Sequence, residues 1–379
     1  MSSFHRLAVP AILAVGLALS AGSLARAQPR PPAAPGPWTR TGSLLTPRDS
    51  FSMTLLQDGS VLAAGGDDAG RALDAAERYD PSAGAWRPTG ALNDPRMFHA
   101  ATPLDDGRVL VAGGATDDGA VLAAAELYDP RTGTWTRTGS MHVGRGSFTA
   151  TLLRDGTVLV AGGFNDFVGD LASAEVYDPR TNAWRVTGSM SVPRESHCAV
   201  LLPDGQVLVI GGSNETGALS SADVYDPATG RWTTTSPMNT PRVDFTATSL
   251  ASGAVLVAGG FAEPGGEVTA SAELYYPAFG TWSATGSLRQ ARVFHSATLL
   301  RDGTVLVTGG LGADGTDELA TAERYDLASG SWRAAGAMTT ARVQHSATLL
   351  PDGRVLVAGA FDGLRALEIA SSELYAPGR

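Results

Sequence analysis

The residue types best suited to chemistry recur at a fixed spacing along this chain. Arginine stands at positions 48, 96, 145, 194, 242, 292 and 342. Three residues after each arginine stands an aromatic ring: Phe51, His99, Phe148, His197, Phe245, His295 and His345. Guanidinium groups bind carboxylates, sulfates and sugar hydroxyls, and imidazole binds metals. If these residues converge, they predict a site for an anion, a sugar or a metal.

Both series also have a structural interpretation. An arginine present in every copy is explained by hydrogen bonds to carbonyls or acids between repeats. Phe replaces His at three of the seven aromatic positions, so the position accepts a flat ring without a nitrogen. For the histidines, packing is therefore favoured over metal binding, and we assign no metal ligand.

Two acids follow the arginines in neighbouring copies. Glu195 directly follows Arg194, and Asp244 lies two residues after Arg242. They would suit an acid/base pair or a polar ligand, or they are charges on a solvated rim. The candidate ligand-binding residues are Arg96, His99, Arg145, Arg194, Glu195, His197, Arg242, Asp244, Arg292, His295, Arg342 and His345. No catalytic residue is assigned.

Three further signatures keep the register of the arginines. Tryptophan falls at 38, 86, 135, 184, 232, 282 and 332. Gly-Gly pairs begin at 65, 113, 162, 211, 259 and 309, and the seventh copy reads Gly359-Ala360. Tyrosine, each time two residues after an acid, falls at 79, 128, 177, 225, 275, 325 and 375. Self-similarity at such an interval is typical of a repeat architecture.

Each copy predicts a small sheet that positions these residues. In residues 96–139, β-favouring runs are separated by an Asp106-Gly107 turn, a Gly113-Gly114 pair and an Asp129-Pro130 turn. Short runs bounded by such signals are typical of hairpins. One copy is therefore expected to form a four-stranded antiparallel sheet.

The Gly-Gly pair after a hydrophobic strand, the Tyr-Asp-Pro turn and the following Trp resemble the kelch family over residues 38–375. The resemblance implies an all-β fold, a seven-bladed β-propeller of four-stranded antiparallel blades. The last copy lacks its Trp strand, while the chain starts with an orphan one at Trp38. We expect this N-terminal strand to pair beside Leu374-Tyr375 and close the ring, because a closed ring leaves no terminal blade uncovered.

The loops between strands 2 and 3 vary most, and in a meander they share one face with the connections from strand 4 to the next strand 1. Function usually lies on such loops. Their aromatics Phe164, Phe167, Phe261 and Phe361 would stack on sugars, anchor a peptide or cap the core. This face is the candidate site for a protein or glycan ligand, and a binding scaffold without catalysis is the favoured function.

Enzymatic alternatives come from the same resemblance. Copper-radical oxidases similar to galactose oxidase use a cysteine crosslinked to a tyrosine; Cys198 lies where that cysteine would, but Asp244 stands at the place of the tyrosine. A sugar epimerase or polysaccharide lyase remains the rival, with His99, His197, Glu195 and Arg194 able to supply its groups. No cofactor is predicted.

The composition bounds location and partners. Residues 1–27 have the basic start, apolar run and small-residue end of a signal peptide, residues 28–37 form a proline-rich linker, and 38–379 are the propeller. We therefore expect a secreted or periplasmic protein without membrane insertion after cleavage. The net charge of −10 argues against nucleic acid, and the absence of lysine excludes Schiff-base chemistry.

Overall fold

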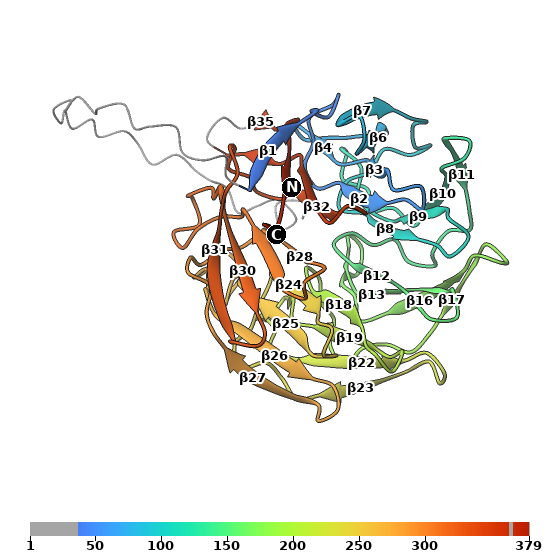
Figure 1. Cartoon of the computed structure of the whole chain (residues 1–379). Coiled ribbons are helices and arrows are strands. Elements are labelled where there is room, and N and C mark those ends of the chain that lie inside the picture. Colours follow the sequence, from blue (N-terminus) through green and yellow to red (C-terminus); the bar gives the residue numbers. More distant parts are fainter. Residues whose placement is uncertain (1–36, 364–366, 379) are drawn as a thin grey trace.

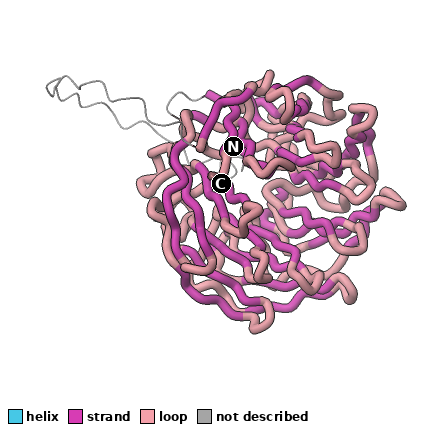
Figure 2. Tube along the Cα trace, in the orientation of Figure 1, coloured by secondary structure: helices cyan, strands magenta, loops and turns pink. Residues whose placement is uncertain are grey.

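The computed structural model describes residues 37–363 and 367–378. Within them, seven four-stranded antiparallel sheets stand around a central axis as the blades of a propeller (Figure 1). The strands and their connecting loops make up this whole part of the chain (Figure 2), and none of it is a helix that could span a membrane. The predicted fold class is confirmed. The predicted signal peptide and nearly all of the linker lie outside the described residues.

Six blades take their four strands from consecutive sequence. They are β2 (Ser52–Leu55), β3 (Val61–Ala64), β6 (Ala76–Asp80) and β7 (Ala85–Pro88) in blade 1; β8 (Ala100–Pro103), β9 (Val109–Ala112), β10 (Ala125–Asp129) and β11 (Thr134–Arg137) in blade 2; β12 (Thr149–Leu152), β13 (Val158–Ala161), β16 (Ala174–Asp178) and β17 (Ala183–Val186) in blade 3; β18 (Cys198–Leu201), β19 (Val207–Ile210), β22 (Ala222–Asp226) and β23 (Arg231–Thr235) in blade 4; β24 (Thr246–Ser249), β25 (Val255–Ala258), β26 (Ala272–Tyr276) and β27 (Thr281–Thr285) in blade 5; and β28 (Ser296–Leu299), β29 (Val305–Thr308), β30 (Thr321–Asp326) and β31 (Ser331–Ala337) in blade 6.

Blade 7 joins the two ends of the chain. It contains β32 (Ser346–Leu349), β33 (Val355–Ala358), β36 (Ser372–Tyr375) and, as its outer strand, β1 (Trp38–Thr41). Trp38 pairs with Tyr375 and Thr39 with Leu374, so the predicted closure of the ring is confirmed. The Trp38 indole N–H also donates to the carbonyl of Ala335 in blade 6 at 3.1 Å, which ties the closing strand to a second blade.

Four short hairpins extend the loops between strands 2 and 3. They are β4–β5 (Asp67–Asp68 and Arg71–Ala72), β14–β15 (Phe164–Asn165 and Gly169–Asp170), β20–β21 (Ser213–Asn214 and Gly217–Ala218) and β34–β35 (Phe361–Asp362 and Leu367–Glu368). We call the face that carries these loops the loop face. The opposite face, which carries the Asp-Gly and Asp-Pro turns, is the turn face.

The core lies between the blades. The second strand of every blade is buried along its whole length, because neighbouring blades cover both of its faces. Leu110 of blade 2, for example, packs in one cluster with Val158 and Val160 of blade 3. Innermost strands of adjacent blades contact one another around the axis, which places the start of each first strand at the mouth of the central channel.

The repeated tyrosines and tryptophans belong to this scaffold. In blade 2 the rings of Tyr128 and Trp135 lie 5.0 Å apart, and the Tyr128 hydroxyl is hydrogen-bonded to Thr89 of blade 1 at 2.8 Å. The ring contact recurs in all seven blades. These aromatic pairs hold the outer strands and join adjacent blades, far from the axis.

Candidate functional site

The repeated arginines lie inside the blades. All seven side chains are 0% exposed. Arg194 Nη1 donates to the carbonyls of Gly211 and Ser221 at 2.7 and 3.0 Å, and its Nη2 lies 3.3 Å from the Asp223 carboxylate. The other six make equivalent bonds to a glycine carbonyl and a third-strand glutamate. The structural interpretation accounts for these contacts, and the six candidates Arg96, Arg145, Arg194, Arg242, Arg292 and Arg342 present no atom to a ligand.

The histidines fill the slot between one blade and the next. His197 Nε2 is hydrogen-bonded to Thr149 of blade 3 at 2.9 Å, and its ring lies on Gly162 of that blade. A Cβ at Gly162, whose φ is +65°, would stand 2.6 Å from the His197 ring, so only glycine fits there. Burial lowers the pKa of His197 to about 3, which keeps the imidazole neutral.

The other three candidate histidines, His99, His295 and His345, repeat this arrangement. Each Nε2 is bonded to a Ser or Thr hydroxyl of the preceding blade. In the remaining blades Phe51, Phe148 and Phe245 occupy the same slot, each against the corresponding glycine. The packing interpretation therefore describes what these rings contact.

The two residues after each arginine face different ways. The first residue pairs with the loop between strands 2 and 3, as Glu195 does with Ser213. The second adopts a positive φ in all seven blades, between 48° and 56°. These seven residues, which we call the axial ring, are Ser50, Phe98, Ser147, Ser196, Asp244, Phe294 and Gln344.

Backbone hydrogen bonds run around the axial ring. The N–H of Phe98 donates to the carbonyl of Ser50 at 3.2 Å, and the same step continues from blade to blade as far as Gln344. Left-handed backbone is uncommon for bulky side chains such as phenylalanine. The six interblade bonds hold it here, and the seven side chains are half-buried at the channel mouth.

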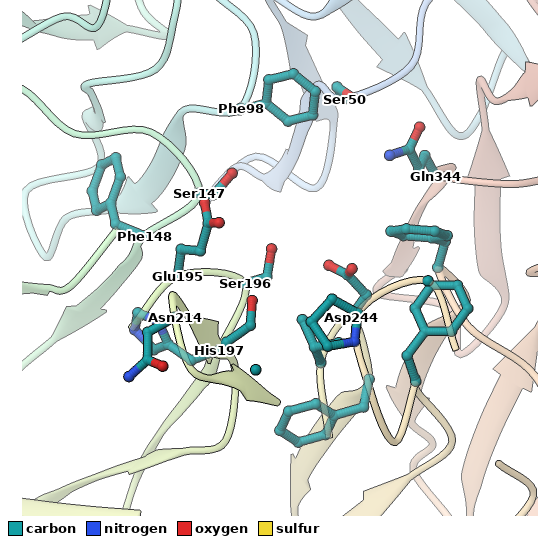
Figure 3. A pocket seen from close by; sticks show the side chains of 18 of the residues that line it. Ser50, Phe98, Ser147, Phe148, Glu195, Ser196, His197, Asn214, Asp244 and Gln344 are labelled. Atoms are coloured by element: carbon teal, nitrogen blue, oxygen red, sulfur yellow. The ribbon is translucent and has the colours of Figure 1, made fainter. Parts of the chain in front are cut away.

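A pocket of about 670 Å³ opens at this mouth on the loop face (Figure 3). All seven axial-ring residues line it, together with parts of the loops of blades 4 and 5, including Asn214, Glu215 and Phe261. Of the sequence candidates, the pocket brings together Glu195, His197 and Asp244. The buried arginines and the histidines of blades 2, 6 and 7 are not part of its lining.

The lining of the pocket combines carboxylates, hydroxyls and aromatic rings. Ser196 stands between Glu195 of blade 4 and Asp244 of blade 5, the Asp244 carboxylate points into the opening, and Phe98 lies across it (Figure 3). Burial raises the pKa of Asp244 to about 7, while a hydrogen bond from Ser196 acts in the opposite direction. Phe294 packs edge-on against Phe261 at 5.8 Å.

The residues do not fit a copper-radical centre. Cys198 donates its thiol hydrogen to the carbonyl of Phe245 at 3.3 Å, and burial raises its pKa to about 12. None of the described residues that line the pocket is a tyrosine. No group of three or more His, Cys, Asp or Glu side chains in the described part of the chain is arranged to hold a metal ion.

A second set of acids lies near blades 7 and 1. Asp49 pairs with Asp67 through the backbone, and Glu368 lies close to both. Burial and these neighbouring carboxylates raise the pKa of Asp49 to about 7, against a hydrogen bond from Ser50. Burial and Glu368 raise the pKa of Asp67 to about 6. Ionising these groups at neutral pH therefore costs stability.

The four loop aromatics differ in exposure, and Phe361 is half-buried. Phe164 and Phe261 are buried, so they cap the core below the loops. Phe167, at the tip of the β14–β15 hairpin, is 97% exposed and is available to a partner on the loop face.

Sequence reasoning assigned only Asp244 of the axial ring as a site residue and missed the other six: Ser50, Phe98, Ser147, Ser196, Phe294 and Gln344. Their common signal is the position two residues after each repeated arginine. The variety of their side chains hid it, since nothing in the residue types marks a shared role.

Comparison with known proteins agrees with this architecture. The family described as the KLHDC2/KLHL20/DRC7 kelch-repeats domain matches residues 87–260, and the Kelch motif matches residues 55–93. No protein of curated function matches significantly.

Two solved structures share the fold at low identity. One is described as a novel fungal alcohol oxidase with catalytic diversity among the AA5 family, in complex with copper; it is 19% identical, with a TM-score of 0.71, over 90% of this chain and 76% of that one. The other, the structure of YjhT, is 17% identical, with a TM-score of 0.61, over 77% of this chain and 98% of that one. With its repeats, its blades and these matches, the chain belongs to the kelch-repeat β-propellers.

Proposed function

We propose that this propeller is an exported binding protein that takes a ligand, or an exposed segment of a protein or glycan partner, into the pocket on its loop face. The observation that carries the proposal is the pocket itself. Its side chains differ from blade to blade, whereas the buried arginines and the aromatic slots are repeated. Variation confined to one concave surface on a rigid scaffold is typical of a recognition site.

The rim supports the same function. Phe167 is fully exposed on the loop face, and Glu215 and Pro264 stand at the edge of the pocket. A partner that fills the pocket would contact these projecting loops as well. Export rests on the sequence of residues 1–27 and is tested by detecting the processed protein outside the cytoplasm.

The experiment is a screen of the mature protein on glycan and peptide arrays, with dissociation constants measured for each hit. Ser196→Phe is the blocking variant, because Phe98 and Phe294 show that this backbone position accepts phenylalanine. Thr229→Phe is the matched control on the turn face, where blade 5 carries Phe279 at the equivalent position.

Loss of binding in Ser196→Phe with retention in Thr229→Phe supports the proposal. If Ser196→Phe binds every hit as tightly as the wild type, or if no hit is found, the proposal is wrong.

A sugar epimerase or lyase is the second candidate, and one observation favours it. A carboxyl group with a pKa of about 7 is suited to general acid/base catalysis at neutral pH, and Asp244 is such a group. His197 is a poor second catalyst, since its Nε2 is bonded to Thr149 and its ring is buried. Turnover assays on each array hit, with Asp244→Asn as the inactive control, distinguish an enzyme from a binding protein.

A further inference from the structure

The charges around the pocket are unequal. Three carboxylates, those of Glu195, Glu215 and Asp244, belong to its lining, whereas no arginine does. The one histidine of the lining, His197, is neutral because burial lowers its pKa to about 3. Among the described residues that line the pocket, none therefore offers a positive charge to an anionic ligand.

The nearest arginines along the chain do not change this balance. Arg194 and Arg242 lie behind the pocket wall, 0% exposed, and each is ion-paired inside its own blade, with Asp223 and Glu273 respectively. Their Nη1 groups donate to glycine carbonyls, and their Nη2 groups donate to these carboxylates.

Two aromatic side chains stand among the polar residues of the axial ring. Phe98 faces the acids across the opening, and Phe294 follows Asp244 in the axial ring (Figure 3). Beneath Phe294, a cluster of buried side chains that includes Val243, Phe261 and Val293 closes the pocket wall. Aromatic faces attract cations as well as apolar groups.

Given the proposed function, on which this step rests, we propose that the ligand carries a protonated amine on an apolar or aromatic body. The amine lies against the carboxylate of Asp244, and the body lies against Phe98 and Phe294. A buried carboxylate binds such a cation strongly, because a charge-assisted hydrogen bond in a partly dehydrated site is stronger than one in water. A neutral ligand of the same shape lacks that bond.

Three small probes of matched shape test the inference: 2-phenylethylamine, 2-phenylethanol and 3-phenylpropionate, titrated calorimetrically into the mature protein near pH 8. The amine is expected to bind at least about tenfold more tightly than the alcohol, with a dissociation constant of about 1 mM or below, and the carboxylate is expected not to bind. Asp244→Asn should weaken the amine about tenfold and leave the alcohol unchanged. Asp117→Asn, an exposed acid on the loop face outside the lining, is the control and should change neither.

Equal affinity for amine and alcohol, an unchanged amine affinity in Asp244→Asn, or no amine binding up to about 10 mM overturns the inference. These outcomes are separate from failure of the proposed function. If array hits are lost in Ser196→Phe while the probes show no preference for the amine, the pocket binds ligands but not through a cation. If Ser196→Phe keeps every hit, the pocket is not the binding site at all.

Discussion

The Nε2 atom of His197 lies 2.9 Å from the Oγ1 atom of Thr149, in the preceding blade. The same bond joins His99 to Ser52, His295 to Thr246 and His345 to Ser296. Where the slot holds Phe148 or Phe245, the preceding blade instead offers Ala100 or Cys198 at that position. The third phenylalanine of these slots, Phe51, faces Ser346 of blade 7, and the Ser346 hydroxyl donates to the Phe51 carbonyl instead of to a ring nitrogen. A histidine thus stands only where the preceding blade has a hydroxyl for it.

The hydrogen bond between Thr149 and His197 predicts that a second substitution restores the stability lost by the first. Thr149→Ala leaves the buried Nε2 of His197 without its partner and should lower the free energy of unfolding by about 1 to 3 kcal/mol. Adding His197→Phe recreates the Ala100 and Phe148 combination of blades 2 and 3, so most of this loss should be recovered. Urea denaturation of the wild type, both single variants and the double variant measures the coupling. Additive losses in the double variant would show that the rings pack independently of the hydroxyls.

The buried arginines predict a large effect on stability. Arg194→Ala removes the counter-charge of the buried Asp223 carboxylate and two hydrogen bonds to carbonyls, so unfolding should become easier by about 3 to 5 kcal/mol. Arg231→Ala, on the exposed outer strand of the same blade, is the control and should change little. A loss below about 1 kcal/mol for Arg194→Ala would contradict a structural role.

Because β1 closes the ring, the thermal stability of the propeller should depend on this N-terminal strand. A chain that begins at residue 43 lacks β1, so β36 becomes an open edge and the Trp38 contacts with blades 6 and 7 are lost. We expect a melting temperature at least about 10 °C below that of a chain that begins at residue 37, together with aggregation. Differential scanning calorimetry of the two chains decides, and equal melting temperatures would show that β1 does not close the ring.

The raised pKa of Asp49 predicts that Asp49→Asn stabilises the fold by an amount that depends on pH. Its folded pKa of about 7 lies above the ordinary value of 3.8, so the fold binds the proton more tightly than the unfolded chain does. The free energy of unfolding therefore decreases as pH rises from about 4 to 7. Asp49→Asn removes this cost, and its stability relative to the wild type should rise by about 2 to 4 kcal/mol between pH 4 and 8. Asp117→Asn is the exposed control; a difference that does not change with pH would be the contrary result.

The raised pKa of Asp244 predicts that amine affinity increases with pH, whereas the stability of the fold decreases with pH at Asp49. Amine binding requires its carboxylate, which is protonated below its pKa of about 7. The affinity for 2-phenylethylamine should therefore fall as pH is lowered from 8 to 6, by up to about tenfold per pH unit below the pKa. Of the other groups that interact with Asp244, Ser196 does not titrate, and Cys198 stays neutral because burial raises its pKa to about 12. Asp244→Asn should show a flat profile, and a wild-type profile that is equally flat would exclude Asp244 from the site.

The architecture could be predicted because it rests on registered repeats. The Trp, Gly-Gly and Tyr signatures indicated seven blades, and the orphan Trp38 indicated the closing strand. The burial of the arginines was harder to predict, since a guanidinium group at a loop boundary suits a ligand as well as a core. The acid two residues before each tyrosine was the missing partner: Glu126 for Arg96 and Asp223 for Arg194.

The inward direction of the axial ring could not be predicted from residue types. Glu195 and Asp244 looked like equivalent loop acids, but the positive φ at Asp244 turns its side chain to the axis, while Glu195 pairs with the Ser213 strand. A left-handed conformation at Ser50, Phe98 or Phe294 has no sequence signal, because glycine is absent and hydrogen bonds between neighbouring blades hold the backbone in it.

Hydrogen exchange with and without the tightest ligand from the arrays tests the central claim most directly, because it locates the bound ligand. We predict slower exchange in peptides that cover the axial ring and its neighbours, residues 48–51, 194–198 and 242–246, with no change in the turn-face segments 226–231 and 276–281. Slower exchange in those turns, with the axial-ring peptides unchanged, would contradict a binding site in the pocket of the loop face.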